Sequence, residues 1–373
     1  MNIQIYNSVE GGAFFRKLID EWTLECDFVE LHKAVSESEY RGAKGTWSRL
    51  SIRWRMYGRF AFSSWRLARE RNGTKIIRLV TTNPFFLPAL VARFSVGRGA
   101  TINLLYDLYP EALIQAGKIK SGSLIACFCG SITRYALREC DATVFLGEHL
   151  KEYIELSYGK ARRSVIIPVG ADGSFFKNCA PKPIERRPTI LYCGQMGRMH
   201  DVDTISGIWA YPESRDCRWV FHASGTGYQK FRDTVAQETG GNVVCGDPLT
   251  DSSWVETMSS AEVALVTIAR GAERVVMPSK TYSALVAGQA VLAICPTKSD
   301  LADLVLNHDC GWVVEPGDIA GLRTVLHEIA SNPEGLQGKR ERAFAAGHKF
   351  YDSAVVAKQW LALFIDLARQ PTA

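Results

Sequence analysis

Short apolar runs alternate with amphipathic stretches along the chain, and the runs end at polar or glycine-containing turns. This pattern predicts a first series of strands at residues 3–6, 28–31, 76–82, 102–106, 143–146 and 165–168. A second series is predicted at residues 189–193, 219–222, 243–245, 263–267, 290–294 and 311–314. Strands that alternate with helices are typical of parallel sheets covered on both faces, so we predict an α/β protein with two doubly wound, Rossmann-like domains facing across a cleft.

Helices are expected from about residue 14 and at residues 279–287, 322–330 and 353–368. Residues 178–188 contain three prolines among charged residues and are interpreted as a linker. A length of 373 residues fits two domains, and 47% hydrophobic with 22% charged residues excludes a mainly disordered or coiled-coil chain.

The ten cysteines include no Cys-x-x-Cys pair, and no Cys/His spacing fits a zinc site. Cys127 and Cys129 lie in the longest apolar run, residues 124–132, where we expect small core side chains. That run is too short to span a bilayer, and the N-terminus begins directly as a strand without a signal peptide. Reduced thiols then indicate a cytoplasmic protein.

The net charge of +5 hides a local excess, because residues 44–71 hold eight basic residues and one acid. On a helix, one stripe contains Trp47, Leu50, Trp54, Tyr57, Ala61, Trp65 and Ala68, and the opposite stripe contains Ile52, Met56, Phe60 and Leu67. Basic residues lie between or beside the stripes: Arg49, Arg53, Arg55, Arg59 and Arg66. We predict that one stripe docks on the domain while the other faces an anionic membrane surface. A solvated helix and a nucleic-acid contact are the alternatives, and we expect no nucleic-acid partner.

Two glycine turns follow predicted strands of the second series. The first contains Gly194, Gly197, Arg198 and His200, and the second contains Gly225 and Gly227. Glycines let the backbone approach an anion at a helix start, although such turns are also common for structural reasons alone. Neither turn completes a Gly-x-Gly-x-x-Gly fingerprint, which disfavours a nicotinamide or flavin site.

Residues 270–285 form the block richest in candidate chemistry. Glu273 can accept two hydroxyls of a sugar or ribose, while Arg274 and Lys280 offer positive charge to a diphosphate, as does Arg270. Pro278 suits the first turn of a helix. The alternative interpretation is a loop of ordinary solvated charges.

Residues 277–282 and 287–291 resemble the donor-binding stretch of GT-B glycosyltransferases, particularly bacterial members of family 4. Residues 107–111 are similar to the Asp-Leu-Trp-Pro-Glu element of that family, and Gly11-Gly12 matches its N-terminal glycine loop. The resemblance implies an acceptor-binding domain over residues 1–180, with the basic insertion at 44–71. It also implies a nucleotide-sugar-binding domain over residues 181–350 and a C-terminal helix, residues 351–373, that packs back on the first domain.

The resemblance also implies site roles. The catalytic set would be Asp107, Glu273, Arg198 and Lys280. The donor side would add Gly12, Gly194, Gly197, His200, Gly225, Gly227, Arg274, Pro278, Ser279, Tyr282 and Ser283. Gly11 and Glu111 would lie on the acceptor side. Ser283 stands where the family carries a ribose-binding glutamate, which replaces a charge-assisted hydrogen bond by a weaker one.

The implied activity is transfer of a hexose-type sugar from a UDP- or GDP-linked donor to a lipid-linked or polysaccharide-precursor acceptor, as in exopolysaccharide synthesis. The family needs no metal or other cofactor, and the resemblance of Asp201-Val202-Asp203 to a metal-binding Asp-x-Asp is interpreted as coincidence. Family 4 members retain the anomeric configuration; in an inverting reaction Asp107 would be the base. The enzyme is expected at the inner face of the plasma membrane. A nucleotide-sugar epimerase of the same fold and an inactive assembly partner remain alternatives.

Overall fold

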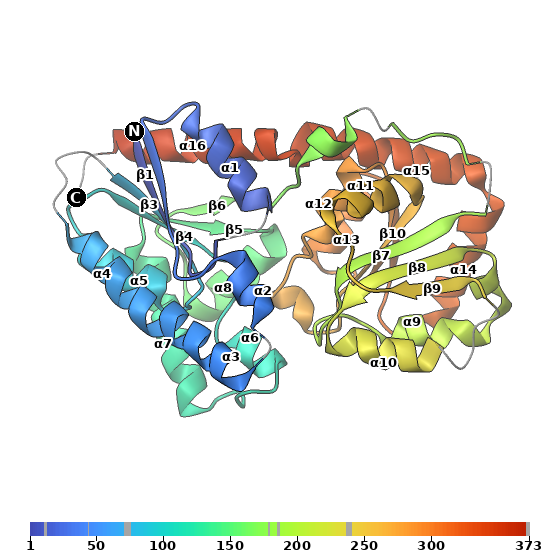
Figure 1. The fold of residues 1–373 in the computed structure, drawn as a ribbon, viewed down its shortest axis with the longest axis horizontal. Helices are drawn as coiled ribbons and strands as arrows, with labels where there is room; N and C mark the ends of the chain where they lie inside the picture. The colour runs from blue at the N-terminus through green and yellow to red at the C-terminus, as the bar shows by residue number, and fades with distance from the viewer. Residues whose placement is uncertain are drawn as a thin grey trace. The chain divides into compact units, whose positions relative to one another are not determined.

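The computed structural model describes residues 1–10, 13–43, 45–70, 76–177, 180–184, 187–235 and 241–370. The chain forms two compact units (Figure 1). Unit 1 contains Met1–Pro168 with Ser353–Ala373, and unit 2 contains Val169–Asp352. The expected linker therefore lies inside unit 2. Its backbone is held there by α15 (Pro333–Ala346), because Gln337 Nε2 donates to the Pro181 carbonyl at 3.1 Å and Arg340 donates to the Lys182 carbonyl at 2.7 Å.

Unit 1 is built on a six-stranded parallel sheet in the order β2-β1-β3-β4-β5-β6. All six expected strands are confirmed, and most are buried on both faces, as parallel strands require. The strand β4 begins and ends two residues earlier than predicted, since Ala100 and Thr101 already pair with Ile77 and Arg78. The strands are β1 (Asn2–Tyr6), β2 (Phe28–His32), β3 (Ile76–Thr81), β4 (Ala100–Leu104), β5 (Ala142–Phe145) and β6 (Ser164–Ile166).

The last helix of the chain belongs to unit 1. Figure 1 shows α16 (Ser353–Arg369) beside α1 (Ala13–Thr23), above the sheet in that view. Trp22 of α1 is buried against Trp360 and Phe364 of α16, with ring centroids 6.0 and 5.2 Å away, and its indole N–H donates to the Ala357 carbonyl. The return of the C-terminal helix to the first domain is thus confirmed.

The opposite face of this sheet is covered by helices packed against one another, and it includes the run that we expected to be core. The buried side of α7 includes Ala126 and Cys129. Cys127 is exposed, so its assignment to the core is wrong. The reason is that residues 124–132 are the first part of a helix that is buried on one side only, and Cys127 lies on its exposed side. The helices of this face are α4 (Phe60–Arg69), α5 (Leu87–Phe94) and α7 (Leu124–Glu139); α2 (Glu37–Gly42), α6 (Glu111–Gln115) and α8 (Glu148–Tyr158) complete the unit.

The basic insertion is one continuous helical segment in three parts: α3 (Thr46–Arg53), the π-helix η1 (Trp54–Arg59) and α4. Ile52, Met56 and Phe60 are buried, so the stripe to which they belong is the one that docks on the domain. The opposite stripe is exposed only as far as Tyr57, because Ala61 and Ala68 are buried. A π-helical turn holds more residues than an α-turn, so it rotates everything after it around the helix axis.

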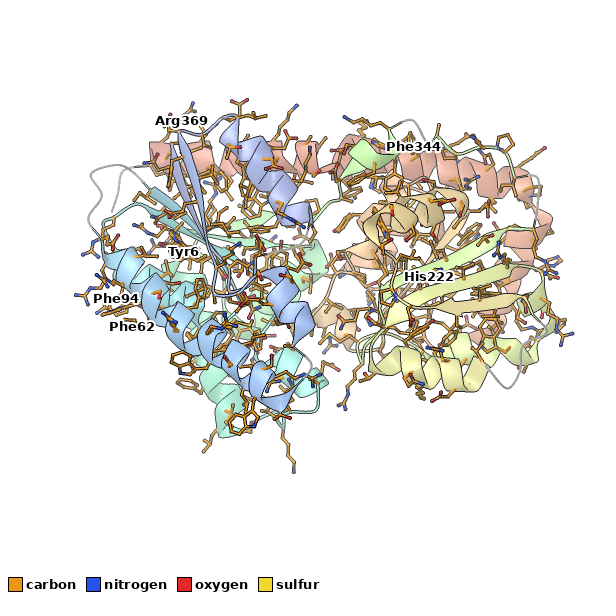
Figure 2. All side chains as sticks on the ribbon, in the orientation of Figure 1. Tyr6, Phe62, Phe94, His222, Phe344 and Arg369 are labelled. Atoms are coloured by element: carbon orange, nitrogen blue, oxygen red, sulfur yellow. The ribbon has the colours of Figure 1, made fainter. Side chains whose placement is uncertain are left out.

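Beyond the π-helix a new aromatic contact forms at the outer side of α4. Trp65 packs against Phe62 and Phe94, with centroids 5.4 and 5.6 Å away, and Figure 2 labels both phenylalanines at this edge of unit 1. The guanidinium of Arg69 lies 4.9 Å from the Trp65 ring.

Unit 2 contains a second six-stranded parallel sheet, in the order β12-β11-β10-β7-β8-β9. The predicted strands are confirmed, and the last three match residue for residue. The chain enters the sheet at its centre, runs outward to β9, returns to β10 beside β7, and then runs outward in the other direction. The strands are β7 (Thr189–Gln195), β8 (Arg218–Ser224), β9 (Val243–Gly246), β10 (Val263–Thr267), β11 (Ala290–Ile294) and β12 (Gly311–Val314).

Helices cover both faces of this second sheet (Figure 1). On one face an aromatic cluster is buried around Trp219 and Phe221 of β8 and Phe231 of α10. That face carries α9 (Asp203–Gly207), α10 (Thr226–Val235) and α14 (Ile319–Ser331), and the other carries α11 (Asp251–Ser260), α12 (Lys280–Val286), α13 (Asp300–Asn307) and α15.

Candidate functional site

The strand order of unit 2 defines where a ligand binds. After β7 the chain turns toward β8, and after β10 it turns toward β11, so the two connections leave neighbouring strands in opposite directions. Ligands of doubly wound sheets bind at the carboxyl ends of the strands at such a switch point. The loop after β7 carries Gly197, Arg198 and His200, and the connection after β10 carries Glu273 and Lys280.

Lys280, the first residue of α12, lies at the centre of this edge. Its Nζ atom donates to the Tyr192 hydroxyl at 2.5 Å and to the Gln195 carbonyl at 3.2 Å, and it lies 4.0 Å from the centre of the Tyr192 ring. The Nε2 atom of His200 is 3.3 Å away. None of these partners is a carboxylate.

Burial without a counter-charge sets the protonation of this cluster. Desolvation lowers the pKa of Lys280 to about 7. The pKa of His200 falls to about 4, through burial and then through the charge of Lys280. An anionic group that entered here would supply the missing negative charge and restore the ammonium form.

Two predicted donor-side glycines, Gly225 and Gly227, bring two loops together. The amide of Gly227 donates to the Met196 carbonyl at 3.0 Å. A Cβ on Gly225 would lie 2.6 Å from that same oxygen, and the φ of +108° at Gly225 is strained for any other residue. These two positions therefore support the loop after β7. Gly194 is the last residue but one of β7, with a φ of +123° and open space at its Cβ position.

The Glu273 side chain at this edge is 15% exposed. It lies in a short 3₁₀ turn, Ala272–Arg274, which begins after Gly271 in the left-handed conformation. Its Oε1 atom is 3.6 Å from the Nε atom of Arg274, and its Oε2 atom is buried with no hydrogen-bond partner among the described residues. An unsatisfied buried carboxylate oxygen is a ready acceptor for a ligand hydroxyl. Arg270 points elsewhere, with its guanidinium donating to the Pro316 carbonyl and lying 3.3 Å from Glu315.

The remaining residues of the α12 start divide into two groups. Pro278 and Tyr282 are buried, and the Tyr282 ring packs 5.2 Å from Tyr351, so both support the helix. Ser279 is exposed, and Ser283 lines a cavity of about 50 Å³ together with Lys280. That volume is far below the few hundred Å³ of a typical ligand pocket, so the cavity does not hold a nucleotide.

Asp201 and Asp203 have structural partners. Asp201 is buried and accepts from the amide of Thr204 at 3.0 Å, and Asp203 accepts from Lys230 at 2.7 Å. Across the described ranges of the chain, no three His, Cys, Asp or Glu side chains form a group that could hold a metal ion.

The matching edge of unit 1 carries Asp107, just after β4. Its amide donates to Thr82 Oγ1, at the end of the neighbouring strand β3, at 3.1 Å. Burial raises the pKa of the Asp107 carboxyl. Gly11 and Gly12, which the resemblance places near the substrates, lie outside the described residues.

Glu111, assigned to the acceptor side, joins two helices. Its carboxylate accepts from the hydroxyls of Tyr153, at 3.2 Å, and Tyr158, both on α8. These bonds hold α6 against α8. Between Asp107 and Glu111 the ring of Tyr109 packs on Phe85 at 5.3 Å.

The five arginines assigned to a membrane surface lie on the helical insertion. Arg55 pairs with Glu39 at 3.0 Å, and Arg49 donates to the Ala43 carbonyl at 3.2 Å. Arg53, Arg59 and Arg66 are exposed. In the part of the chain that the structure describes, no helix is both long and apolar enough to cross a membrane.

Two aromatic contacts of these edges were missed from the sequence. Tyr192 was assigned only as a strand residue, yet its hydroxyl accepts from Lys280. Tyr57 of η1 lies close enough to Asp107 for that carboxylate to add to burial and to Tyr40 in raising the pKa of Tyr57. No periodic pattern marks either residue, because the contacts depend on how distant loops fold together.

Comparisons with known proteins point in one direction. No protein-family model matches the chain. A probable glycosyltransferase of Pseudomonas aeruginosa, WbjE, is 22% identical over 287 residues, which cover 72% of this chain and 69% of the relative. Sucrose-phosphate synthase from Thermosynechococcus elongatus superposes with a TM-score of 0.73 at 13% identity, over 98% of this chain and 99% of that one. Anabaena HepE in complex with UDP-glucose gives 0.70 at 12% identity, with coverage of 98% and 99%.

These superpositions cover both units. Two six-stranded parallel sheets with helices on both faces, matched over nearly the whole length, show that the chain has the GT-B fold. The fold that the resemblance implied is confirmed, while the specific likeness to family 4 stays a prediction.

Proposed function

We propose that the chain is a glycosyltransferase that moves a hexose-type sugar from a UDP- or GDP-linked donor to a lipid-linked or polysaccharide-precursor acceptor. The observation that carries this proposal is the Lys280 amine at the β7/β10 switch point, which donates to Tyr192 and Gln195 and has no carboxylate partner among the described residues. The similarity to a probable glycosyltransferase and to a structure that holds UDP-glucose supports it.

Breaking a glycosyl–phosphate bond builds negative charge on the leaving diphosphate. A cation at that position stabilises the transition state more than the ground state, and one such donor contributes about 3–4 kcal/mol. In this proposal Lys280 takes that role, and exposed Arg198 reaches the same diphosphate from the loop after β7. Glu273 accepts hydroxyls of the donor sugar through its free Oε2 atom.

Reaction without a metal fits this arrangement, because Lys280 and Arg198 supply the positive charge that a divalent ion supplies elsewhere. We also propose that the reaction retains the anomeric configuration, so that the leaving phosphate accepts the proton of the acceptor hydroxyl. Asp107 then positions the acceptor from unit 1.

Attachment to the cytoplasmic face of the plasma membrane is a further part of the proposal. The insertion exposes Trp47 (85%) and Trp54 (64%) on the side opposite its buried stripe, and Arg53 and Arg59 are exposed on the same helical segment. A helical segment that exposes both aromatic and basic side chains suits the interface of an anionic bilayer.

The test is a product analysis with a panel of UDP- and GDP-sugars and a lipid-linked saccharide extract. The proposal expects a sugar-extended acceptor together with free nucleoside diphosphate. Turnover of the donor to an isomeric sugar without any acceptor would identify an epimerase instead. Absence of both transfer and hydrolysis, with formation of a complex with a second transferase, would identify an inactive assembly partner and would agree with Ser283 at the glutamate position.

A further inference from the structure

The first turn of α7 exposes three large apolar side chains. Leu124 is 89% exposed, Phe128 is 64% exposed and Ile125 is 59% exposed. They follow the loop of residues 116–123, and Phe128 stands one turn after Leu124, while Ala126 and Cys129 on the other side of the helix are buried. A contiguous apolar group on a water-exposed surface marks a contact site for another molecule.

The charge around this turn identifies the kind of molecule. Residues 112–138 contain four basic residues and no Asp or Glu. Lys118 and Lys120 are exposed immediately before the helix, and Arg134 is exposed two turns further along it. The fourth, Arg138, pairs with Glu139 at 2.7 Å. An apolar tip that follows two exposed lysines, in a segment without acids, is complementary to an anionic bilayer, whose phosphates lie above its acyl chains.

The same charge disfavours a second copy of the chain as the occupant. In a symmetric dimer each patch meets its own copy, so Lys118 and Lys120 would face like charges, and residues 112–138 contain no acid to offset them. A bilayer presents only negative and neutral headgroups and imposes no such repulsion.

The helical insertion and the start of α7 belong to one region of unit 1. The first part of the insertion, α3, and α7 both lie in the lower part of the unit in Figure 1. Tyr109 connects them. Its carbonyl accepts from Thr133 Oγ1 of α7 at 2.7 Å, and Tyr57 of η1 is close enough to add to the effect of burial in raising the pKa of Tyr109. The loop that carries Asp107 therefore lies near both elements.

We propose that the first turn of α7 is a second membrane-contact element, which inserts Leu124, Ile125 and Phe128 into the interface of an anionic bilayer. This inference rests on the proposed membrane attachment and extends it from the arginine-bearing insertion to a separate, apolar anchor. Two anchors on one unit fix its orientation, whereas one helix leaves it free to turn. The Asp107 loop is then held at the membrane surface, where the head of a lipid-linked acceptor lies.

Cys127 provides a direct probe, because it stands between Ile125 and Phe128 and is the exposed one among the described cysteines. The full chain is labelled there with an environment-sensitive thiol fluorophore, with Cys127→Ser as the labelling control. Vesicles of equal parts phosphatidylglycerol and phosphatidylcholine are added, and pure phosphatidylcholine vesicles serve for comparison. The inference predicts a blue-shifted, brighter emission with the anionic vesicles and quenching by lipids that carry a quencher in the acyl chain.

A matched pair of variants measures the contribution of the turn. The double variant Leu124→Ser/Phe128→Ser is expected to lower the vesicle-bound fraction by about tenfold or more, with an unchanged melting temperature. Leu156→Ser/Leu306→Ser, which removes two exposed leucines elsewhere, is expected to bind as the parent protein does.

Each other outcome overturns the inference in a distinguishable way. The chain could bind vesicles with water-like emission from the label and with no effect of Leu124→Ser/Phe128→Ser. That result would show that α7 does not contact the membrane and would agree with attachment through the insertion alone. Failure of the parent chain to bind anionic vesicles would refute the proposed membrane attachment as a whole. The proposed sugar transfer would be unaffected. A blue shift that grows with protein concentration in the absence of vesicles would assign the patch to self-association.

Discussion

The Nε2 atom of His200 lies 3.3 Å from the Nζ atom of Lys280, while the Nδ1 atom of His200 accepts the amide N–H of Gly197 at 3.1 Å. A neutral imidazole with an acceptor at Nδ1 carries its proton on Nε2, which then points at Lys280. Two donors would oppose each other, so the contact favours a neutral amine that accepts from the imidazole. This agrees with the lowered pKa values of both groups, about 7 for Lys280 and about 4 for His200.

The first prediction concerns the pH dependence of donor binding. Above pH 7 the free protein carries Lys280 as a neutral amine, and a bound diphosphate favours the ammonium, so binding takes up a proton. Affinity for the correct UDP- or GDP-sugar is expected to be highest below pH 7 and to fall by up to about tenfold per pH unit above it. Calorimetric titration in buffers of different ionisation enthalpy measures the proton uptake directly.

Lys280→Arg and Lys280→Met are the controls for this prediction. Arginine stays charged over the whole range, so Lys280→Arg is expected to give a pH-independent affinity. Lys280→Met is expected to weaken donor binding at every pH and to abolish the proton uptake. A slope that persists in either variant would show that another group titrates.

A second prediction concerns Glu273, whose buried Oε2 atom has no partner in the described part of the chain. Glu273→Gln replaces a charged acceptor by a neutral amide, and a hydrogen bond to a charged group contributes about 1.5–3 kcal/mol. Transfer is therefore expected to fall by about 10- to 100-fold in kcat/KM. Glu213→Gln, which alters an ion pair with Arg323 elsewhere in unit 2, is the matched control. Unaltered turnover in Glu273→Gln would remove this residue from the site.

Asp107 carries a third prediction, because burial raises the pKa of its carboxyl and it belongs to unit 1, whereas the proposed donor contacts belong to unit 2. Asp107→Asn is expected to lower kcat/KM for the acceptor by about 10- to 100-fold and to leave donor binding unchanged. The product formed by the parent enzyme is expected to keep the anomeric configuration of the donor, as read by NMR. An inverted product, together with complete loss of activity in Asp107→Asn, would make this carboxylate the general base.

The fourth prediction tests the insertion as a membrane contact. Arg53 and Arg59 are exposed, whereas Arg55 is paired with Glu39, so the informative change is Arg53→Glu/Arg59→Glu. Each basic residue near an anionic surface contributes about 1 kcal/mol, and charge reversal adds repulsion. Sedimentation with phosphatidylglycerol vesicles at low salt is expected to show at least about tenfold weaker binding. Arg215→Glu/Arg232→Glu, with the same charge change on unit 2, is expected to bind normally.

The fifth prediction is one of stability. Gly225→Ala would place a Cβ 2.6 Å from the Met196 carbonyl oxygen at a φ of +108°. We expect a loss of about 1–3 kcal/mol in the free energy of unfolding, measured by urea denaturation. Gly45→Ala, at a negative φ with open space around the new Cβ, is expected to be nearly neutral. Equal stability of the two variants would show that the loop after β8 can move away.

The strands were predictable because parallel strands buried on both faces are uninterrupted apolar runs, as in β10, β11 and β12. The position of Lys280 at the start of a helix followed from Pro278 and from the family resemblance. The residues that contact Lys280 could not be predicted from the sequence, because its hydrogen bond to Tyr192 joins residues 88 positions apart.

Local patterns also misled in two places. The run at residues 124–132 contains enough apolar side chains for a core element, and composition cannot tell that Leu124 and Phe128 face outward. A helical wheel of constant pitch placed Ala61 and Ala68 on the exposed stripe, and the π-helix η1 rotates them inward.

Calorimetric titration of the parent chain with UDP, GDP, their common sugars and NAD tests the central claim most directly. We predict that one nucleoside diphosphate and its sugar conjugate bind, that Lys280→Met weakens this binding, and that NAD does not bind. Binding of NAD, with no binding of any UDP or GDP compound, would contradict the assignment of this chain as a glycosyltransferase.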